Sequence, residues 1–252
     1  MFYLAAANEP AALVTAMNKV ISGFRLLAGY LQMVRDPARL DVVFRMMDGV
    51  RESDADGAIS GFLSRPEVRA VTGDTRPPLY LRLEELRALP EGSLGRAYAE
   101  FIDAHGFDLE ALYRFKDRRR EATLEPEERL TIHMERSHDL WHVVTGFETD
   151  IAGELGLQAF YVAQLGTPIA AAVISALLLN AVVRAPLDVP ERMEAISTGW
   201  RHGQACESLF GADWAALVHE PLEDVRARFG ITPAAVAGAA ACVSCEAQRS
   251  AA

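Results

Sequence analysis

The stretch 136–154, RSHDLWHVVTGFETDIAGE, contains two histidines, an aspartate beside the first and a glutamate twelve residues after the second. His138 and His142 are four residues apart, and residues at that spacing lie on one face of a helix. Their imidazoles can therefore bind one metal ion, as in other His-x-x-x-His helices. Asp139 is about 100° around the helix from His138 and can reach the same ion from the side.

Glu154 needs a reversal of the chain before it can join this site. On one continuous helix it would lie roughly 18 Å along the axis from His142. Gly146 can end the first helix, and Thr149 or Asp150 can cap a second helix that carries Glu154. The stretch therefore predicts a helix hairpin that brings two imidazoles and two carboxylates together. The alternative is that the histidines are ordinary half-buried side chains and the acids are solvated.

The chemistry of this ligand set does not select one metal. Two imidazoles and two carboxylates suit Zn²⁺, and equally Fe²⁺, Mn²⁺ or Co²⁺. Asp139 and Leu140 follow the first histidine, so the stretch is not the His-Glu-x-x-His motif of zinc proteases. The glutamate that acts as general base in those enzymes is absent from this motif.

Length and charge limit the classes of function. The 252 residues fit one large domain or two small ones, and half of them are hydrophobic, as in globular proteins. The net charge of -10 argues against binding to nucleic acid, which needs clustered Lys and Arg. The basic run RFKDRRR at 114–120 could contact anionic lipid, although a solvated helix face is the favoured interpretation.

Several other residues with chemical potential carry weaker signals. The chain has three cysteines, Cys206, Cys242 and Cys245, which indicates a reducing compartment rather than a disulfide framework. We interpret Cys206 as a core thiol and the lone C-x-x-C pair at 242–245 as incidental. His133 is expected at the surface. Arg136 could meet a substrate carboxylate or phosphate, but a solvent-facing arginine is more common.

The pattern of apolar residues is helical along most of the chain. We expect helices at 10–34, from Pro37 with Asp36 as cap, from Ser64, on both sides of the turn at 90–92, before Gly146, at 190–210 and at 221–231. The second helix after residue 80 should end at Gly106. No series of alternating strands is visible. These elements predict one all-α domain over 1–231, followed by an Ala-rich flexible tail at 232–252.

The region 155–183 contains no charged residue and is long enough for a membrane span. Gln158, Gln164 and the segment 166–168 interrupt it, so two buried helices joined at 166–168 fit better than one span. Helices that are apolar on all sides belong in a core or line an apolar cavity. The N-terminus, MFYLAAANEP, has no basic region typical of a secretory signal, and we expect a cytoplasmic protein of a bacterium.

The stretch SHDLWHVVTGFETDIAGE resembles the His-Asp-x-x-His-x(11)-Glu signature of the coenzyme Q (ubiquinone) biosynthesis protein 4 family. ALPEGSLGRAYAEFI at 88–102 is similar to its Leu-Pro-x-Gly-Thr-Leu-Gly-x-x-Tyr segment, with Ser93 in place of the usual threonine. GWRHGQACESLFGADW and EPLEDVRARFGI resemble its C-terminal pattern, except that Ala215 stands where the family commonly has glutamate. The resemblance covers roughly 65–231.

This resemblance implies an α-helical fold with His138, Asp139, His142 and Glu154 as metal ligands. Zinc is the metal that the family favours, and iron, cobalt and manganese are alternatives. The resemblance also implies an apolar, lipid-binding cavity for a polyprenyl chain and peripheral contact with the inner face of the bacterial membrane. The expected partners are a polyprenylated quinone precursor or another isoprenoid lipid and other coenzyme Q biosynthesis proteins. A homodimer is plausible.

The family resemblance leaves two roles open. One is an enzyme that acts at ring carbon 1 of the polyprenylated 4-hydroxybenzoate-type head group, removing the carboxylate and leaving a hydroxyl, which would make it a metal-dependent oxidative decarboxylase. The other is a non-catalytic scaffold that presents lipid intermediates to the biosynthetic complex. A metallohydrolase is a third class, and it would need an open metal position and a nearby base.

Overall fold

The computed structural model describes residues 9–37, 42–43, 46, 58–73, 77–110, 113 and 124–234. Within these ranges the regular elements are all helices, and a single bridge between Ser93 and Pro221 is the one extended pairing. The helices are α1 (Glu9–Arg35), α3 (Ala58–Leu63), α4 (Pro66–Thr72), α5 (Leu83–Arg87), α6 (Leu94–His105), α9 (Pro126–Thr145), α10 (Ile151–Leu165), α11 (Pro168–Arg184), the 3-10 turn Pro186–Asp188, α12 (Val189–Ala205), α13 (Trp214–Leu217) and α14 (Leu222–Phe229). The prediction of an all-α fold is confirmed.

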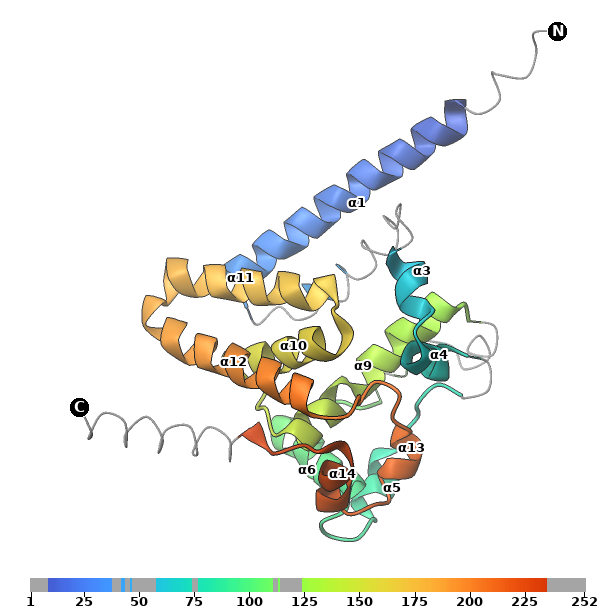
Figure 1. Ribbon diagram of the computed structural model, residues 1–252, viewed down its shortest axis with the longest axis vertical. Coiled ribbons are helices and arrows are strands. Elements are labelled where there is room, and N and C mark those ends of the chain that lie inside the picture. The colour runs from blue at the N-terminus through green and yellow to red at the C-terminus, as the bar shows by residue number, and fades with distance from the viewer. Residues whose placement is uncertain are drawn as a thin grey trace, which may run out of the picture.

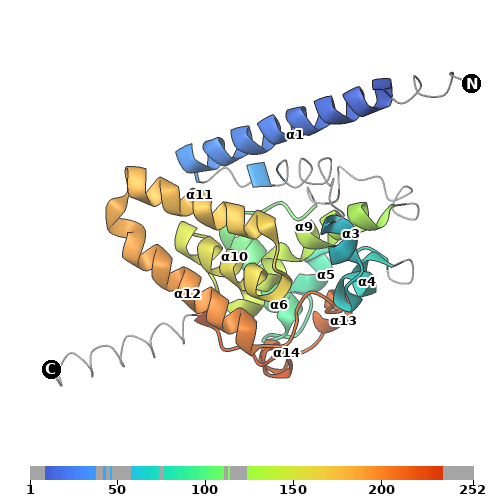
Figure 2. The same cartoon turned by 45° about the horizontal axis from the view of Figure 1, so that its top comes forward.

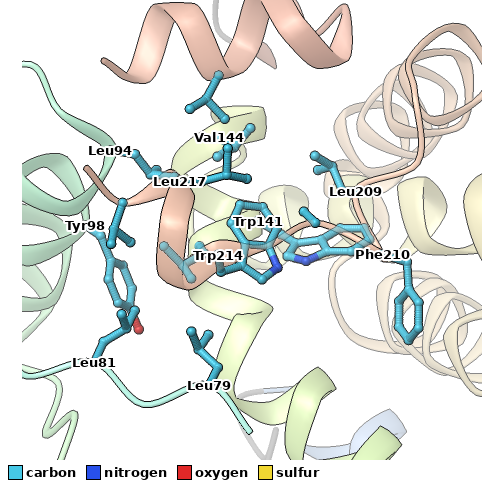
Figure 3. Close-up of a cluster of buried hydrophobic side chains, with 14 of the residues drawn as sticks. Leu79, Leu81, Leu94, Tyr98, Trp141, Val144, Leu209, Phe210, Trp214 and Leu217 are labelled. Atoms are coloured by element: carbon cyan, nitrogen blue, oxygen red, sulfur yellow. The ribbon is translucent and has the colours of Figure 1, made fainter. Parts of the chain in front are cut away.

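The larger hydrophobic core lies in the middle of the molecule and surrounds α9. Trp141 of α9 and Trp214 of α13 lie at the centre of this cluster, and each is at most 2% exposed (Figure 3). Side chains from α6, from the segment 77–82 and from the 209–210 segment surround the two indoles. Burying a side chain as large as these stabilises the fold by about 1.5–3 kcal/mol each, so this cluster fixes α9 in place.

A second, smaller core joins α1 to the α10–α11 pair. It consists of seven buried residues, namely Met33, Val42, Met46, Leu155, Val173, Ala176 and Leu177. The Asn180 amide of α11 also donates a 2.8 Å hydrogen bond to the Val34 carbonyl of α1. Among the described side chains of α1, those that pack in this core come from its C-terminal part, and its N-terminal part extends beyond the other helices (Figures 1 and 2).

The uncharged region folds as the two helices that the sequence predicts. α10 ends at Gly166, whose φ of 64° lies in the left-handed region that glycine favours, and Pro168 begins α11. Among the described helices, none is both long and apolar enough to cross a membrane. α12 lies directly on α10: a Cβ added to Gly199 would come within 1.9 Å of the Gly156 carbonyl oxygen.

Some sequence predictions need correction or lie beyond the described ranges. The helix predicted to begin with Ser64 begins one residue later, with Arg65 as the N-cap residue of α4. The Ser64 hydroxyl donates instead to the Gly61 carbonyl. Most of the helix predicted after Asp36 lies outside the described residues. The same holds for the basic run 114–120, for the pair Cys242 and Cys245, and for the tail beyond 234. The domain boundary at 231 therefore stays a prediction.

Candidate metal centre

Local signals at both ends of a short loop form the hairpin that carries the site. α9 ends at Gly146, which adopts a left-handed φ of 73° and donates its N–H to the His142 carbonyl at 2.8 Å. α10 begins with Asp150 as N-cap, whose side chain accepts from the Gly153 N–H at 2.7 Å. The predicted hairpin is therefore confirmed, with Asp150 rather than Thr149 as the cap.

Three of the predicted ligands converge across this hairpin, and we refer to His138, His142 and Glu154 as the three-residue cluster. The two Nε2 atoms are 3.2 Å apart. Glu154 places Oε1 3.3 Å from Nε2 of His142 and Oε2 3.7 Å from Nε2 of His138. One potential ligand atom from each residue lies within 4.8 Å of the others, so the group could hold one ion.

Neighbouring groups fix both imidazole rings from behind. Nδ1 of His142 lies 2.9 Å from the Phe147 carbonyl oxygen. Because a carbonyl only accepts, Nδ1 donates to it, and Nε2 is left on the side of the ring that faces Glu154. Nδ1 of His138 lies 3.3 Å from the Tyr161 hydroxyl, which can support the same tautomer. Such partners orient histidine ligands and increase their basicity.

The electrostatics of the cluster keep Glu154 ionised. Burial alone would raise the pKa of Glu154, but hydrogen bonds from His138 and His142 outweigh it and lower the pKa to about 2. For His138, burial lowers the pKa, whereas the hydrogen bond and negative charge of Glu154 raise it, and the net shift is upward. Glu154 is therefore a buried anion that faces two imidazole nitrogens, an arrangement of donors that suits a divalent cation.

Asp139 is not part of this group. It is half-buried and lines the same cavity as His138, but its carboxylate is not among the atoms that lie within 4.8 Å of one another. Three of the four predicted ligands are therefore brought together in the described structure. A fourth ligand role for Asp139 stays a prediction.

His138 and Glu154 of the cluster form part of the wall of a cavity of about 390 Å³, which we call the α9–α11 cavity. Ligand sites are commonly of this size or larger. Its lining is mainly apolar and comes from α6, α9, α10, the start of α11 and neighbouring segments: Val43, Ile102, Phe107, Leu109, Met134, Ile169 and Ala170. Its polar lining residues outside the cluster are Asp108, Glu135, Asp139, Gln158, Tyr161 and Thr167.

Tyr161 and Phe101 have places at the site that the sequence analysis did not identify. Tyr161 is buried and its ring stacks on Trp141 with centroids 4.4 Å apart. Phe101 of α6 stacks on the His142 ring at 6.0 Å. The only sequence signal for Tyr161 is its position seven residues after Glu154, which puts both on one face of α10. Nothing in the sequence connects Phe101 to the motif.

Two predictions about α9 were wrong, because this helix is covered on more than one side. His133 is buried, not at the surface, and its Nε2 lies 3.1 Å from the Phe210 carbonyl oxygen. Arg136 is only 2% exposed, donates to the Leu79 carbonyl at 2.9 Å and lies 4.8 Å from the centre of the Tyr113 ring. It therefore stabilises the core and is not turned to solvent.

Cys206 is half-buried at the C-terminal end of α12. Burial is the main cause that raises the pKa of its thiol to about 11, so it is a poor nucleophile near neutral pH. This agrees with its interpretation as a structural thiol.

The fold and the cluster together define a class of all-helical protein with a candidate metal centre on a helix hairpin beside an apolar cavity. The chain belongs to the Coenzyme Q (ubiquinone) biosynthesis protein Coq4 family, whose sequence profile matches residues 64–235. This finding agrees with the resemblance seen in the sequence.

Individual relatives agree with the family assignment. A mitochondrial ubiquinone biosynthesis protein coq4 from Talaromyces stipitatus is 32% identical over 177 residues, which cover 67% of this chain and 57% of the relative. One from Coprinopsis cinerea is 28% identical over 82% of this chain and 70% of its own. The chain thus matches less than two thirds of the length of several of these relatives.

A solved structure has a similar fold. The crystal structure of a protein from Nostoc punctiforme, provisionally assigned to ubiquinone biosynthesis, superposes with a TM-score of 0.69 at 29% identity. The match covers 82% of this chain and 97% of that protein.

Proposed function

We propose that this protein acts in ubiquinone biosynthesis by binding a divalent metal in the three-residue cluster and a polyprenylated quinone precursor in the α9–α11 cavity. The main support is that two residues of the cluster, His138 and Glu154, form part of the wall of a mainly apolar cavity. A prenyl tail held against the apolar wall would place a polar head group beside His138 and Glu154. A site of this kind suits an amphipathic substrate better than a water-soluble one.

The reaction that we propose is replacement of the carboxyl at ring carbon 1 of a 4-hydroxybenzoate-type head group by a hydroxyl. With water as the source of oxygen, this change releases carbon dioxide, two protons and two electrons, so a two-electron acceptor is required. A bound metal would supply Lewis acidity toward the carboxylate oxygens at ring carbon 1. Zn²⁺ has no redox chemistry, so zinc would need a separate acceptor, whereas iron, cobalt or manganese could take part in electron transfer.

The residues of the chain contribute orientation and the exclusion of water. The Phe147 carbonyl and the Tyr161 hydroxyl hold the two imidazoles, and Glu154 supplies the negative charge. Three protein ligands leave coordination positions open for a substrate, as in catalytic rather than structural zinc sites. Asp139, nearby on the cavity wall, is available to complete the ligand set or to take a proton from the head group.

A peripheral membrane position would give the cavity access to such a lipid. Four apolar side chains of α1, Ile21, Phe24, Leu27 and Leu31, are 42–70% exposed. Apart from Glu9 at its start, the charged residues of α1 are all basic. An apolar helix face with basic residues fits a helix that lies in the interface of an anionic membrane. We extend the proposal to contact with the inner face of the bacterial membrane, with other coenzyme Q biosynthesis proteins and with a second copy of the chain.

A non-catalytic, lipid-presenting role is the second candidate, and the same apolar cavity favours it. The enzymatic role predicts turnover of the bound lipid, and the lipid-presenting role predicts binding without turnover. The test uses the purified full chain and a His138→Ala/His142→Ala variant, with metal measured by elemental mass spectrometry. Both are incubated with a prenylated 4-hydroxybenzoate that carries ¹³C in its carboxyl, together with a two-electron acceptor.

We expect near-stoichiometric metal, release of labelled carbon dioxide and a ring-hydroxylated product, with metal and product lost in the variant while its helical circular dichroism is kept. Lipid binding without release of label would favour the lipid-presenting role. Failure to bind either metal or lipid, even after metal is added, would contradict the proposed function.

A further inference from the structure

Two glutamines interrupt the uncharged region, and they have different surroundings. The Gln164 amide is fully engaged in structure. Its Nε2 donates to the Glu207 carbonyl at 2.9 Å and to the Cys206 sulfur at 3.2 Å, and its Oε1 accepts from the Leu209 N–H at 3.0 Å. Gln164 therefore ties α10 to the segment after α12, and its presence in an apolar helix is explained.

Gln158 has no comparable structural role. It is half-buried, it lines the α9–α11 cavity, and within the described part of the chain its amide makes no hydrogen bond or ion pair. An amide offers two donors and an acceptor, and those of Gln158 are not used by the described fold. Because Gln158 lines the cavity and is half-buried, its amide is available to a ligand that enters there.

The position of Gln158 relative to the cluster indicates which part of a ligand it would meet. Glu154, Gln158 and Tyr161 lie at i, i+4 and i+7 of α10, on one face, and all three line the cavity. Four residues advance about 6 Å along a helix, which is comparable to the span of a benzene ring with oxygen substituents at opposite ends. A ring whose carboxylate lies at the cluster would therefore direct its opposite hydroxyl toward Gln158.

We infer that Gln158 is a specificity-determining residue that recognises the hydroxyl opposite carbon 1 of the head group. This role rests on the proposed function. The amide oxygen can accept from a phenol, and the amide N–H can donate to a phenolate, so either protonation state of the ring oxygen is recognised. A ring without this hydroxyl would leave the amide unpaired in the complex and would bind less tightly.

The test compares 3-geranyl-4-hydroxybenzoate with 3-geranylbenzoate, which lacks only the ring hydroxyl. Binding to the metal-loaded full chain is measured by calorimetry in a mild detergent. We expect the hydroxylated ligand to bind roughly five- to tenfold more tightly to the natural chain, as for one neutral hydrogen bond. Gln158→Leu should bind the two ligands alike, with its affinity for 3-geranylbenzoate close to that of the natural chain.

Thr167→Val is the matched control. Thr167 also lines the cavity, and its side chain makes no capping bond to α11, so this nearly isosteric change removes a cavity hydroxyl without disturbing the helix. It should keep the preference. Gln158→Met is a second apolar replacement with an unbranched side chain, and metal content and circular dichroism verify the fold of each variant.

The outcomes separate this inference from the proposed function. Binding of both ligands with equal affinity by the natural chain, or a preference that survives both Gln158 substitutions, would overturn the role of Gln158 and leave the proposed function standing. Failure of the natural chain to bind either ligand would overturn both.

Discussion

His142 is the most firmly held residue of the three-residue cluster. Its side chain is 1% exposed, its Nδ1 bonds to the Phe147 carbonyl, and Phe101 stacks on its ring. His138 is 24% exposed, and its second nitrogen meets the Tyr161 hydroxyl at the longer distance of 3.3 Å. The two imidazoles are therefore unequal, and His138 is the one whose protonation responds more readily to a ligand in the cavity.

Metal affinity should fall as the pH falls. Glu154 stays ionised far below neutrality because its pKa is about 2, so it does not limit binding. The pKa of His138 is raised, and an imidazole binds metal only after it loses its proton. Below that pKa, each unit by which the pH falls should therefore weaken the apparent affinity for the metal about tenfold, because His138 must lose one proton before it binds.

Chelator competition at a series of pH values measures this slope, and the proton released on metal addition can be counted by calorimetry in two buffers. His138→Ala is the control, because it should bind more weakly but with a flatter pH profile. An affinity of the natural chain that does not change across the titration range of histidine would show that His138 is not a ligand.

Among the described helices, α10 and α12 are the pair whose backbones come closest together. A Cβ on Gly199 would lie 1.9 Å from the Gly156 carbonyl oxygen, and one on Gly203 would lie 2.8 Å from the Phe160 carbonyl oxygen. These obstacles are backbone atoms, which cannot turn aside as a flexible side chain can. Because α10 carries Glu154, Gln158 and Tyr161, the position of the site depends on this contact.

Gly199→Ala should therefore destabilise the protein by about 1–3 kcal/mol, the usual cost of an overpacked core. Gly23→Ala is a matched control, because Gly23 lies inside α1 with no atom within 4 Å of an added Cβ. That change should raise stability by about 0.5–1 kcal/mol through helix propensity. Urea unfolding measures both, and equal shifts for the two variants would contradict close packing of α10 on α12.

The hairpin could be predicted from the sequence because its signals are local. Gly146 and Asp150 end and begin helices through contacts within a few residues, and the four-residue spacing of His138 and His142 decides that they share a face. The remainder depends on contacts between distant segments. His133 is buried because Phe210 covers it, and no periodicity within α9 records that contact.

The same limit applies to the site. Sequence reasoning named three residues that meet. It also named Asp139, which lines the same cavity but whose carboxylate is outside the group of close ligand atoms, because adjacency in sequence fixes a direction around the helix but not the path of a side chain. It also identified Gln158 and Gln164 only as interruptions. Their different surroundings depend on the segment after α12, which lies far along the chain.

For the whole molecule, a distinctive feature is α1, whose described side chains are divided between a packed face and an exposed face. Its inner face packs in the smaller core, whereas Phe24 is 70% exposed and Leu27 is 54% exposed. In both views α1 lies at the edge of the molecule, beyond α11 (Figures 1 and 2). This arrangement suits the proposed contact with a lipid bilayer, with the three-residue cluster in the main body.

The Phe24→Ser/Leu27→Ser variant should therefore bind at least tenfold more weakly to vesicles of anionic phospholipid, since each change removes a large apolar side chain from the interface. Co-sedimentation with vesicles measures this, and thermal unfolding should be little changed because neither residue is in the core. Leu187→Ser is the control: Leu187 is 92% exposed but lies in the turn before α12. An equal loss with Leu187→Ser, or no loss with the α1 variant, would argue against α1 as the membrane contact.

The hairpin also has a consequence for how the protein is made. All three cluster residues come from the single stretch 138–154, so closing the loop between them costs little chain entropy compared with joining distant segments. A nascent chain that has just exposed residue 165 therefore already carries all three residues of the cluster, whereas α12, against which α10 packs, is synthesised later.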